Sequence, residues 1–149
     1  MEVTWCAVAA TGNVVTYDGV NKTLAVYGAN GSQLARRRDR SCFFAFELSG
    51  DGLCLLAGGE SGKVLFLDVE TLQLMSCLPN VPAASGYLTG VCEETGSKGF
   101  GKAITSLRLM SGEQTLWVGV EGGGGFVCRH DRSYLRKRLE KQLQSLGFF

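Results

Sequence analysis

Apolar residues in the middle of the chain recur with the period of two that is typical of β-strands. Phe44, Phe46 and Leu48 alternate with smaller or polar neighbours, which predicts a half-buried strand. Residues 53–58 form a nearly unbroken apolar run, as in a strand that is covered on both faces. Two further strand-like runs follow, at 63–68 and 73–78.

Turn signals of glycine and small polar residues separate these runs. The three turns are Ser49-Gly50-Asp51-Gly52, Glu60-Ser61-Gly62 and Val69-Glu70-Thr71. Glycine suits them because it takes the positive φ of tight turns without steric cost. Four short antiparallel strands joined in this way predict one blade of a β-propeller.

The same pattern repeats along the chain. A shift of 61 residues places Phe46 on Leu107, Gly58 on Gly119 and Glu60 on Glu121 without a gap. Upstream, a similar strand rhythm occurs about 40 residues earlier, and repetition at this period favours a propeller over a single sandwich. The predicted blades cover about residues 3–38, 42–78 and 103–130, with an inserted segment at about 80–102.

The middle blade resembles the WD-repeat family. Residues 55–68 are similar to that family's LLASGSxDGxVxxWD segment, and the turn at 49–52 resembles its SPDG turn. Leu67 stands where the family usually has tryptophan, Ser61 stands where it has a buried aspartate, and no Gly-His pair precedes a blade. The resemblance implies a propeller fold and a scaffolding role in protein complexes.

Composition excludes several classes of function. The chain has 149 residues, 45% of them hydrophobic, which is enough to bury the core of one domain. A formal net charge of +1 gives no general attraction to nucleic acid or to membranes. We see no secretory signal and no apolar run of membrane-spanning length, so any membrane contact is expected to be peripheral.

The cysteines and two glycine-rich motifs do not predict a chemical site. Six scattered cysteines lack the close pairing of zinc ligands, so we expect reduced, buried thiols and a cytoplasmic location. Residues 96–103 fit the phosphate-binding pattern GxxxxGK, but Ala103 replaces the required Ser or Thr and a strand is expected next. Cys128 and His130 lack an orienting third group. We therefore predict no catalytic residue, no cofactor and no metal.

The end of the chain changes to a helical period. Leucines at 135, 139, 143 and 146 share one face, and Gly147 is suited to end the helix. We expect an amphipathic helix at about 133–146 that replaces the fourth strand of the last blade. The fold class is therefore all-β: a partial β-propeller of about three four-stranded WD-like blades with a C-terminal amphipathic helix.

Two basic clusters are the candidate partner-binding residues. They are Arg36, Arg37, Arg38 and Arg40 in the first blade, and Arg136, Lys137, Arg138 and Lys141 in the helix. An acidic protein partner or, for the helix, anionic lipid fits these charges. Because closed propellers typically have four to eight blades, three blades leave open edges. These edges could be covered by a longer chain, by self-association or by a partner.

The predicted function is a non-catalytic protein–protein interaction scaffold, as the C-terminal part of a larger WD-repeat protein. Two alternatives remain open. One is a membrane-trafficking adaptor, because degenerate WD-like blades followed by a basic helix are similar to the C-terminal propeller of BEACH-domain proteins. The other is a structural subunit that completes a propeller with a partner.

Overall fold

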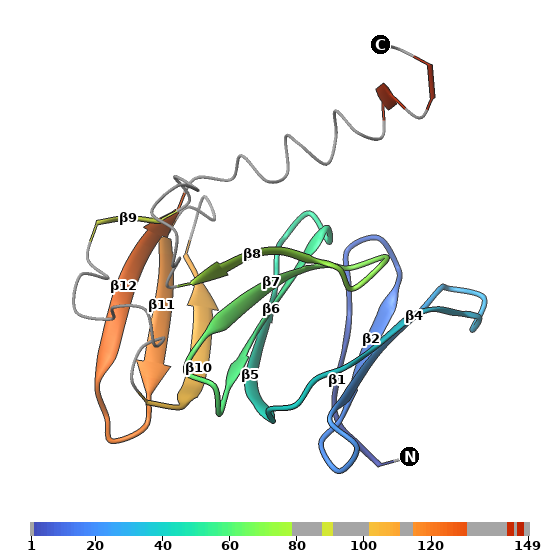
Figure 1. The fold of residues 1–149 in the computed structure, drawn as a ribbon. Coiled ribbons are helices and arrows are strands. Elements are labelled where there is room, and N and C mark those ends of the chain that lie inside the picture. The colour runs from blue at the N-terminus through green and yellow to red at the C-terminus, as the bar shows by residue number, and fades with distance from the viewer. Residues whose placement is uncertain are drawn as a thin grey trace.

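Three antiparallel sheets of four strands each make up the fold (Figure 1). The computed structural model describes residues 2–78, 88–90, 102–110, 115–130, 143–144 and 146–147. We call the sheets blades 1, 2 and 3, from the N-terminus onward. In Figure 1 they stand side by side, with blade 2 between the other two. The chain therefore forms an all-β arc of propeller blades, as the sequence predicts.

The strands follow one another along the chain in blades 1 and 2. Blade 1 consists of β1 (Val3–Val8), β2 (Val14–Asp18), β3 (Thr23–Tyr27) and β4 (Gln33–Arg38). Blade 2 consists of β5 (Phe43–Leu48), β6 (Cys54–Gly59), β7 (Val64–Asp68) and β8 (Leu74–Leu78). All six residues of β6 are buried, which confirms the prediction that this strand is covered on both faces.

Blade 3 takes its fourth strand from an unexpected part of the chain. Its order is β10 (Ile104–Leu109), β11 (Thr115–Val120), β12 (Gly125–His130) and then β9 (Leu88–Gly90). Strand β9 comes from the inserted segment and pairs antiparallel with the last three residues of β12. The prediction that the terminal helix replaces this strand is therefore wrong. An extended segment that satisfies the hydrogen-bonding groups at the edge of β12 takes that place.

The predicted repeat appears in the register of the strands. The first two strands of each blade pair with one irregularity, between Val3 and Trp5, between Phe43 and Ala45, and between Ile104 and Ser106. These positions are related by the same shifts of 40 and 61 residues that the sequence shows. The same bulge thus recurs at the equivalent position of all three sheets. This recurrence supports the prediction that the three sheets are repeats of one structural unit.

This bulge changes which phenylalanine enters the core. The sequence pattern places Phe44 on the buried face of its strand. In the structure Phe44 is 56% exposed, whereas Phe43 is 5% exposed and packs among the side chains between blades 1 and 2. Phe43 pairs with Gly59 and Ala45 with Gly58, so Phe44 is the extra residue of the bulge. The prediction for Phe44 is therefore wrong, and Phe46 keeps its predicted place.

Two apolar layers hold the blades together. The layer between blades 1 and 2 includes Val15, Leu24 and Leu55, and Trp5 of β1 stacks on Phe46 of β5 at a centroid distance of 4.3 Å. The layer between blades 2 and 3 includes Leu56 and Phe66, with strand β10 packed against β5 and β6. Each sheet is thus stabilised mainly by burial against its neighbour.

The glycine-rich segments form the turns that the sequence predicts. Gly62, between β6 and β7, has a φ of 74°, and its N–H donates to the carbonyl of Gly59 at 3.0 Å. Gly122 and Gly123, between β11 and β12, also have positive φ. Strand β10 follows Ala103 directly, so the GxxxxGK pattern precedes a strand and not the helix that a phosphate-binding loop requires.

The predicted C-terminal helix lies largely outside the described residues. Leu143 and Gln144 are helical, and Gly147 has a φ of 87° with its N–H donating to the carbonyl of Gln144 at 3.0 Å. Leu146, one of the four predicted stripe leucines, is 72% exposed. Within the described residues, no helix is long and apolar enough to cross a membrane. The helix as a whole stays a prediction.

Removing the hydroxyl of Tyr17 should weaken the contact between blades 1 and 2. The buried Tyr17 hydroxyl accepts the N–H of Phe43 at 3.0 Å. We expect Tyr17→Phe to lower the free energy of unfolding by about 1–3 kcal/mol, because a buried N–H loses its acceptor. Urea denaturation followed by circular dichroism measures this loss. Tyr27→Phe, on a half-buried tyrosine of β3, is the control and should change stability little; equal losses in both variants would contradict the prediction.

Candidate interaction surfaces

The arginines of strand β4 divide between the two faces of blade 1. Arg36 and Arg38 are exposed, and they alternate along the strand with the half-buried Arg37. Nη1 of Arg37 donates to the carbonyl oxygen of Leu72 at 3.2 Å, in the turn between β7 and β8 of blade 2. Arg37 therefore ties blade 1 to blade 2, whereas Arg36 and Arg38 remain available to a partner.

Arg40 follows β4 in the connection to blade 2 and is exposed. The Nζ of Lys22 donates to its carbonyl oxygen at 3.0 Å, which leaves the guanidinium outside that contact. Arg38 and Arg40 line one shallow hollow together with Lys22 and Asp39. Three exposed arginines thus lie along the outer edge of blade 1, as the sequence predicts for an exposed strand and turn. The four candidate basic residues of the terminal helix lie outside the described residues.

A smaller hollow, with a volume of about 190 Å³, lies on the face of blade 1 that is turned away from blade 2. Its wall includes Asp18, Tyr27 and Arg36. The Asp18 carboxylate accepts the side-chain Nδ2–H of Asn21 at 2.8 Å and the backbone N–H groups of Asn21 and Val20 at 3.1 and 3.0 Å. These hydrogen bonds, with the side chain of Asn21 first, lower the pKa of Asp18 to about 2. Asp18 thus serves the β2–β3 turn.

The described residues contain no assembled chemical centre. Among them, no three His, Cys, Asp or Glu side chains come close enough to hold a metal ion. The cysteines whose side chains are described are all free thiols, and burial raises the pKa of Cys77. Cys54 is buried, as predicted, but Cys6 is exposed on the open face of blade 1, so the prediction of burial is wrong for Cys6.

The departures from the WD-repeat pattern have structural substitutes. Leu67, in the place of the usual tryptophan, is fully buried between blades 1 and 2. Ser61, in the place of the usual aspartate, accepts the N–H of Lys63 at 3.3 Å within its turn. The Glu60 side chain accepts the N–H of Cys42 at 3.1 Å. The blade is therefore held by packing and turn hydrogen bonds.

Exposed apolar side chains are the feature that the sequence analysis missed. Trp117 is 51% exposed and Met110 is 45% exposed, both in blade 3, while Val8 of blade 1 is 68% exposed. The signal was available, because the shift of 61 residues places Trp117 on Leu56, which is buried between blades 2 and 3. An exposed tryptophan at an inter-blade position indicates an uncovered blade face.

Solved propeller structures are similar to this chain, although no model of a known protein family matches it and no curated protein matches it. The C-terminal WD40 domain of Sif2 matches with a TM-score of 0.63 and 13% identity over 87% of this chain and 34% of that one. The β-propeller domain of Cps50 (Swd1) from Myceliophteria thermophila matches with a TM-score of 0.61 and 10% identity over 84% and 34%. BBS1N, in complex with ARL6DN, matches with a TM-score of 0.62 and 14% identity over 89% of this chain and 36% of that one.

These similarities define the class of fold: the chain has the architecture of part of a β-propeller. It spans about a third of the length of each of these three structures. At such low sequence identity the match concerns the fold alone, and function has to be argued from the surfaces.

Proposed function

We propose that this chain is a non-catalytic protein–protein interaction scaffold, in which three WD-like blades form part of a propeller ring. The observation that carries the proposal is the row of exposed arginines at the outer edge of blade 1, on a framework fixed by two buried layers. A rigid sheet edge with three cations suits an acidic protein segment, because guanidinium groups pair well with carboxylates. BBS1N, a structural neighbour, has a protein partner in its complex with ARL6DN, which supports a protein ligand for this fold.

An arc of three blades also needs further blades to form a closed ring. Two sources of these further blades are proposed. One is a larger WD-repeat protein of which this chain is the C-terminal part, and the other is a partner subunit. A trafficking adaptor of the BEACH type, acting through the basic terminal helix, is likewise a proposal, as is the cytoplasmic location.

Reversing the exposed charges of β4 should weaken binding to an acidic peptide. The probe is a fluorescein-labelled peptide of glutamate and aspartate, titrated with the purified chain and followed by fluorescence anisotropy. We expect the double variant Arg36→Glu/Arg38→Glu to bind about tenfold more weakly, because two exposed ion pairs of up to about 1 kcal/mol each are lost. Binding of the unaltered chain should also weaken as salt is added.

The matched control is Lys102→Glu, which reverses an exposed charge at the start of blade 3. It should bind the peptide nearly as well as the unaltered chain. A loss of binding in Lys102→Glu as large as that of the single variant Arg36→Glu would show that only the net charge matters. Undiminished binding by the β4 variant would contradict the proposal that this edge is the docking surface.

A further inference from the structure

Each blade presents one face to the blade before it and one face to the blade after it. Blade 2 is covered on both sides, so two faces of the arc remain open (Figure 1). The blade 1 open face carries Cys6, Val8, Val14 and Thr16, which alternate along β1 and β2 with residues that pack against blade 2. The blade 3 open face carries Arg108 and Trp117, which are register partners on β10 and β11, and the neighbouring Met110.

Both open faces continue an interface that already occurs twice within the chain. The register makes Trp117 of blade 3 equivalent to Leu56 of blade 2 and to Val15 of blade 1. Leu56 is 1% exposed because blade 3 covers it, and Val15 is fully buried because blade 2 covers it. Val14 on the other open face is equivalent to Leu55 and Leu116, which are also fully buried. The positions that bury apolar side chains between blades are therefore the ones left open at the two ends.

The side chains on these faces change in size from blade to blade. On the face toward the following blade, one position grows from Val15 to Leu56 to Trp117, whereas two neighbouring positions shrink, from Trp5 and Tyr17 in blade 1 to Ser106 and Gly119 in blade 3. On the face toward the preceding blade, a set of large residues in blade 3 becomes a set of small ones in blade 1. These sets are Leu107, Leu116 and Val118 in blade 3, Phe46, Leu55 and Ala57 in blade 2, and Cys6, Val14 and Thr16 in blade 1.

Trp117 is thus a large side chain beside two small residues, Ser106 and Gly119. The blade 1 positions proposed to receive it, Cys6, Val14 and Thr16, are small, which is what close packing of two surfaces requires. Blade 2 separates the two faces within one chain (Figure 1), so they can meet only between chains. We infer that two copies of this chain assemble head to tail, with Trp117 of each copy packed on the Cys6–Val14–Thr16 surface of the other. This inference rests on the proposed function and names the source of the missing blades; in the dimer an acidic segment reaches Arg36 and Arg38 from the outermost strand, β4.

Such a dimer forms a closed ring of six blades, within the usual range of four to eight. A twofold axis makes its two contacts identical, so no open blade face remains. Arg36 and Arg38 pair with Ala25 and Thr23 on the open face of blade 1, so they lie in the outermost part of this contact, where they do not oppose Arg108. Arg108 lies on β10, the first strand of its sheet, whereas Arg36 and Arg38 lie on β4, the last strand of theirs. Three strand spacings of about 4.8 Å separate these positions across a blade face.

Light scattering after size-exclusion chromatography tests the assembly on the full 149-residue chain. The unaltered chain should have twice the 16.0 kDa mass of one copy. Trp117→Arg and Thr16→Arg, each placing a charge in the contact, should each weaken dimerisation by at least about 100-fold. A mixture of these two variants should form dimers again, because one of its two contacts then combines an unaltered Trp117 with an unaltered Thr16.

Phe44→Arg is the matched control, since Phe44 is an aromatic residue of similar exposure outside both open faces; it should dimerise normally. Circular dichroism establishes that each variant is folded, and Val8→Arg on the same open face replaces Thr16→Arg if that variant does not fold. A monomeric unaltered chain, an open-ended oligomer, or a mixture that does not recover the dimer would overturn the inference. Peptide binding that persists in such a monomer would leave the proposed scaffold function intact.

Discussion

Replacing Phe66 with alanine is expected to lower the free energy of unfolding by about 3–5 kcal/mol. Phe66 lies on β7, is 1% exposed, and belongs to the apolar layer between blades 2 and 3. Its removal leaves a cavity where blade 2 meets the next sheet, and the surrounding strands are held in register and can fill it only in part. Urea denaturation followed by tryptophan fluorescence and by circular dichroism measures the loss.

Phe44→Ala is the matched control for this prediction. Phe44 is the exposed residue of the bulge in β5, so its removal should change stability by less than about 0.5 kcal/mol. A large loss for Phe44→Ala, together with a small one for Phe66→Ala, would mean that the two phenylalanines have been placed on the wrong faces.

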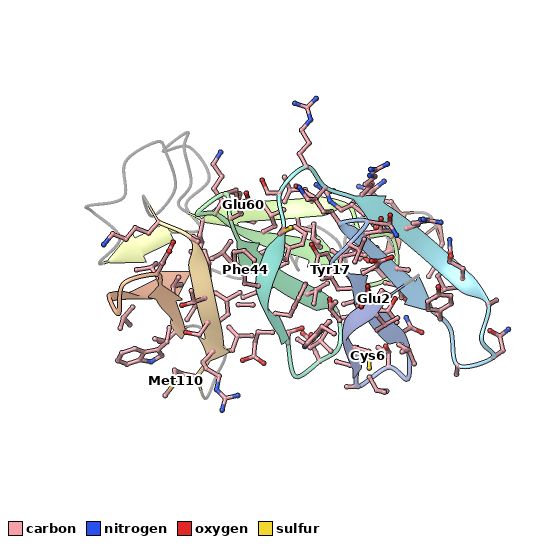
Figure 2. The ribbon with its side chains drawn as sticks, turned by 90° about the horizontal axis from the view of Figure 1, so that it is seen from below. Glu2, Cys6, Tyr17, Phe44, Glu60 and Met110 are labelled. Carbon is pink, nitrogen blue, oxygen red and sulfur yellow. The ribbon has the colours of Figure 1, made fainter. Side chains whose placement is uncertain are left out.

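Adding a single methyl group at Gly59 should also be strongly destabilising. Gly59 ends β6 opposite Phe43 and directly precedes Glu60, which is labelled in Figure 2. The three atoms nearest to a β-carbon at Gly59 are all backbone: the carbonyl oxygen of Cys42, Cα of Phe43 at 2.7 Å and N of Phe44 at 2.9 Å. Backbone cannot rotate away as a side chain can. We expect Gly59→Ala to lower the free energy of unfolding by about 3 kcal/mol or more.

Gly28→Ala is the control for Gly59→Ala. A β-carbon at Gly28 would meet only the tips of side chains, Oδ1 of Asn30 at 3.2 Å and the methyl groups of Leu34 at 3.7 and 3.8 Å. This variant should lose less than about 1 kcal/mol. The equivalents of Gly59 in the other blades carry side chains, Asp18 and Val120. Undiminished stability of Gly59→Ala would therefore show that the bulge in β5 relaxes toward the geometry of its neighbours.

The sequence by itself determined the repeated unit and its turns. Alternation of apolar residues depends only on the two faces of a strand, and the positive φ of Gly62 or Gly122 depends only on the local chain. Both can be read without knowing which strands are partners. The shift that places Phe46 on Leu107 and Gly58 on Gly119 also reappears as an identical register in blades 2 and 3.

The tertiary structure alone decided the features that depend on distant partners. Strand β9 joins blade 3 because the edge of β12 is available to it. The three residues of β9 are too few to show a strand pattern in the sequence, so this pairing could not be predicted. The bulge turns Phe43 inward and Phe44 outward, since an extra residue reverses the alternation. Strand periodicity separates Arg37 from Arg36 and Arg38, but only the position of blade 2 decides which of these faces is covered. Trp117 is exposed for the same reason: burial is set by the neighbouring blade.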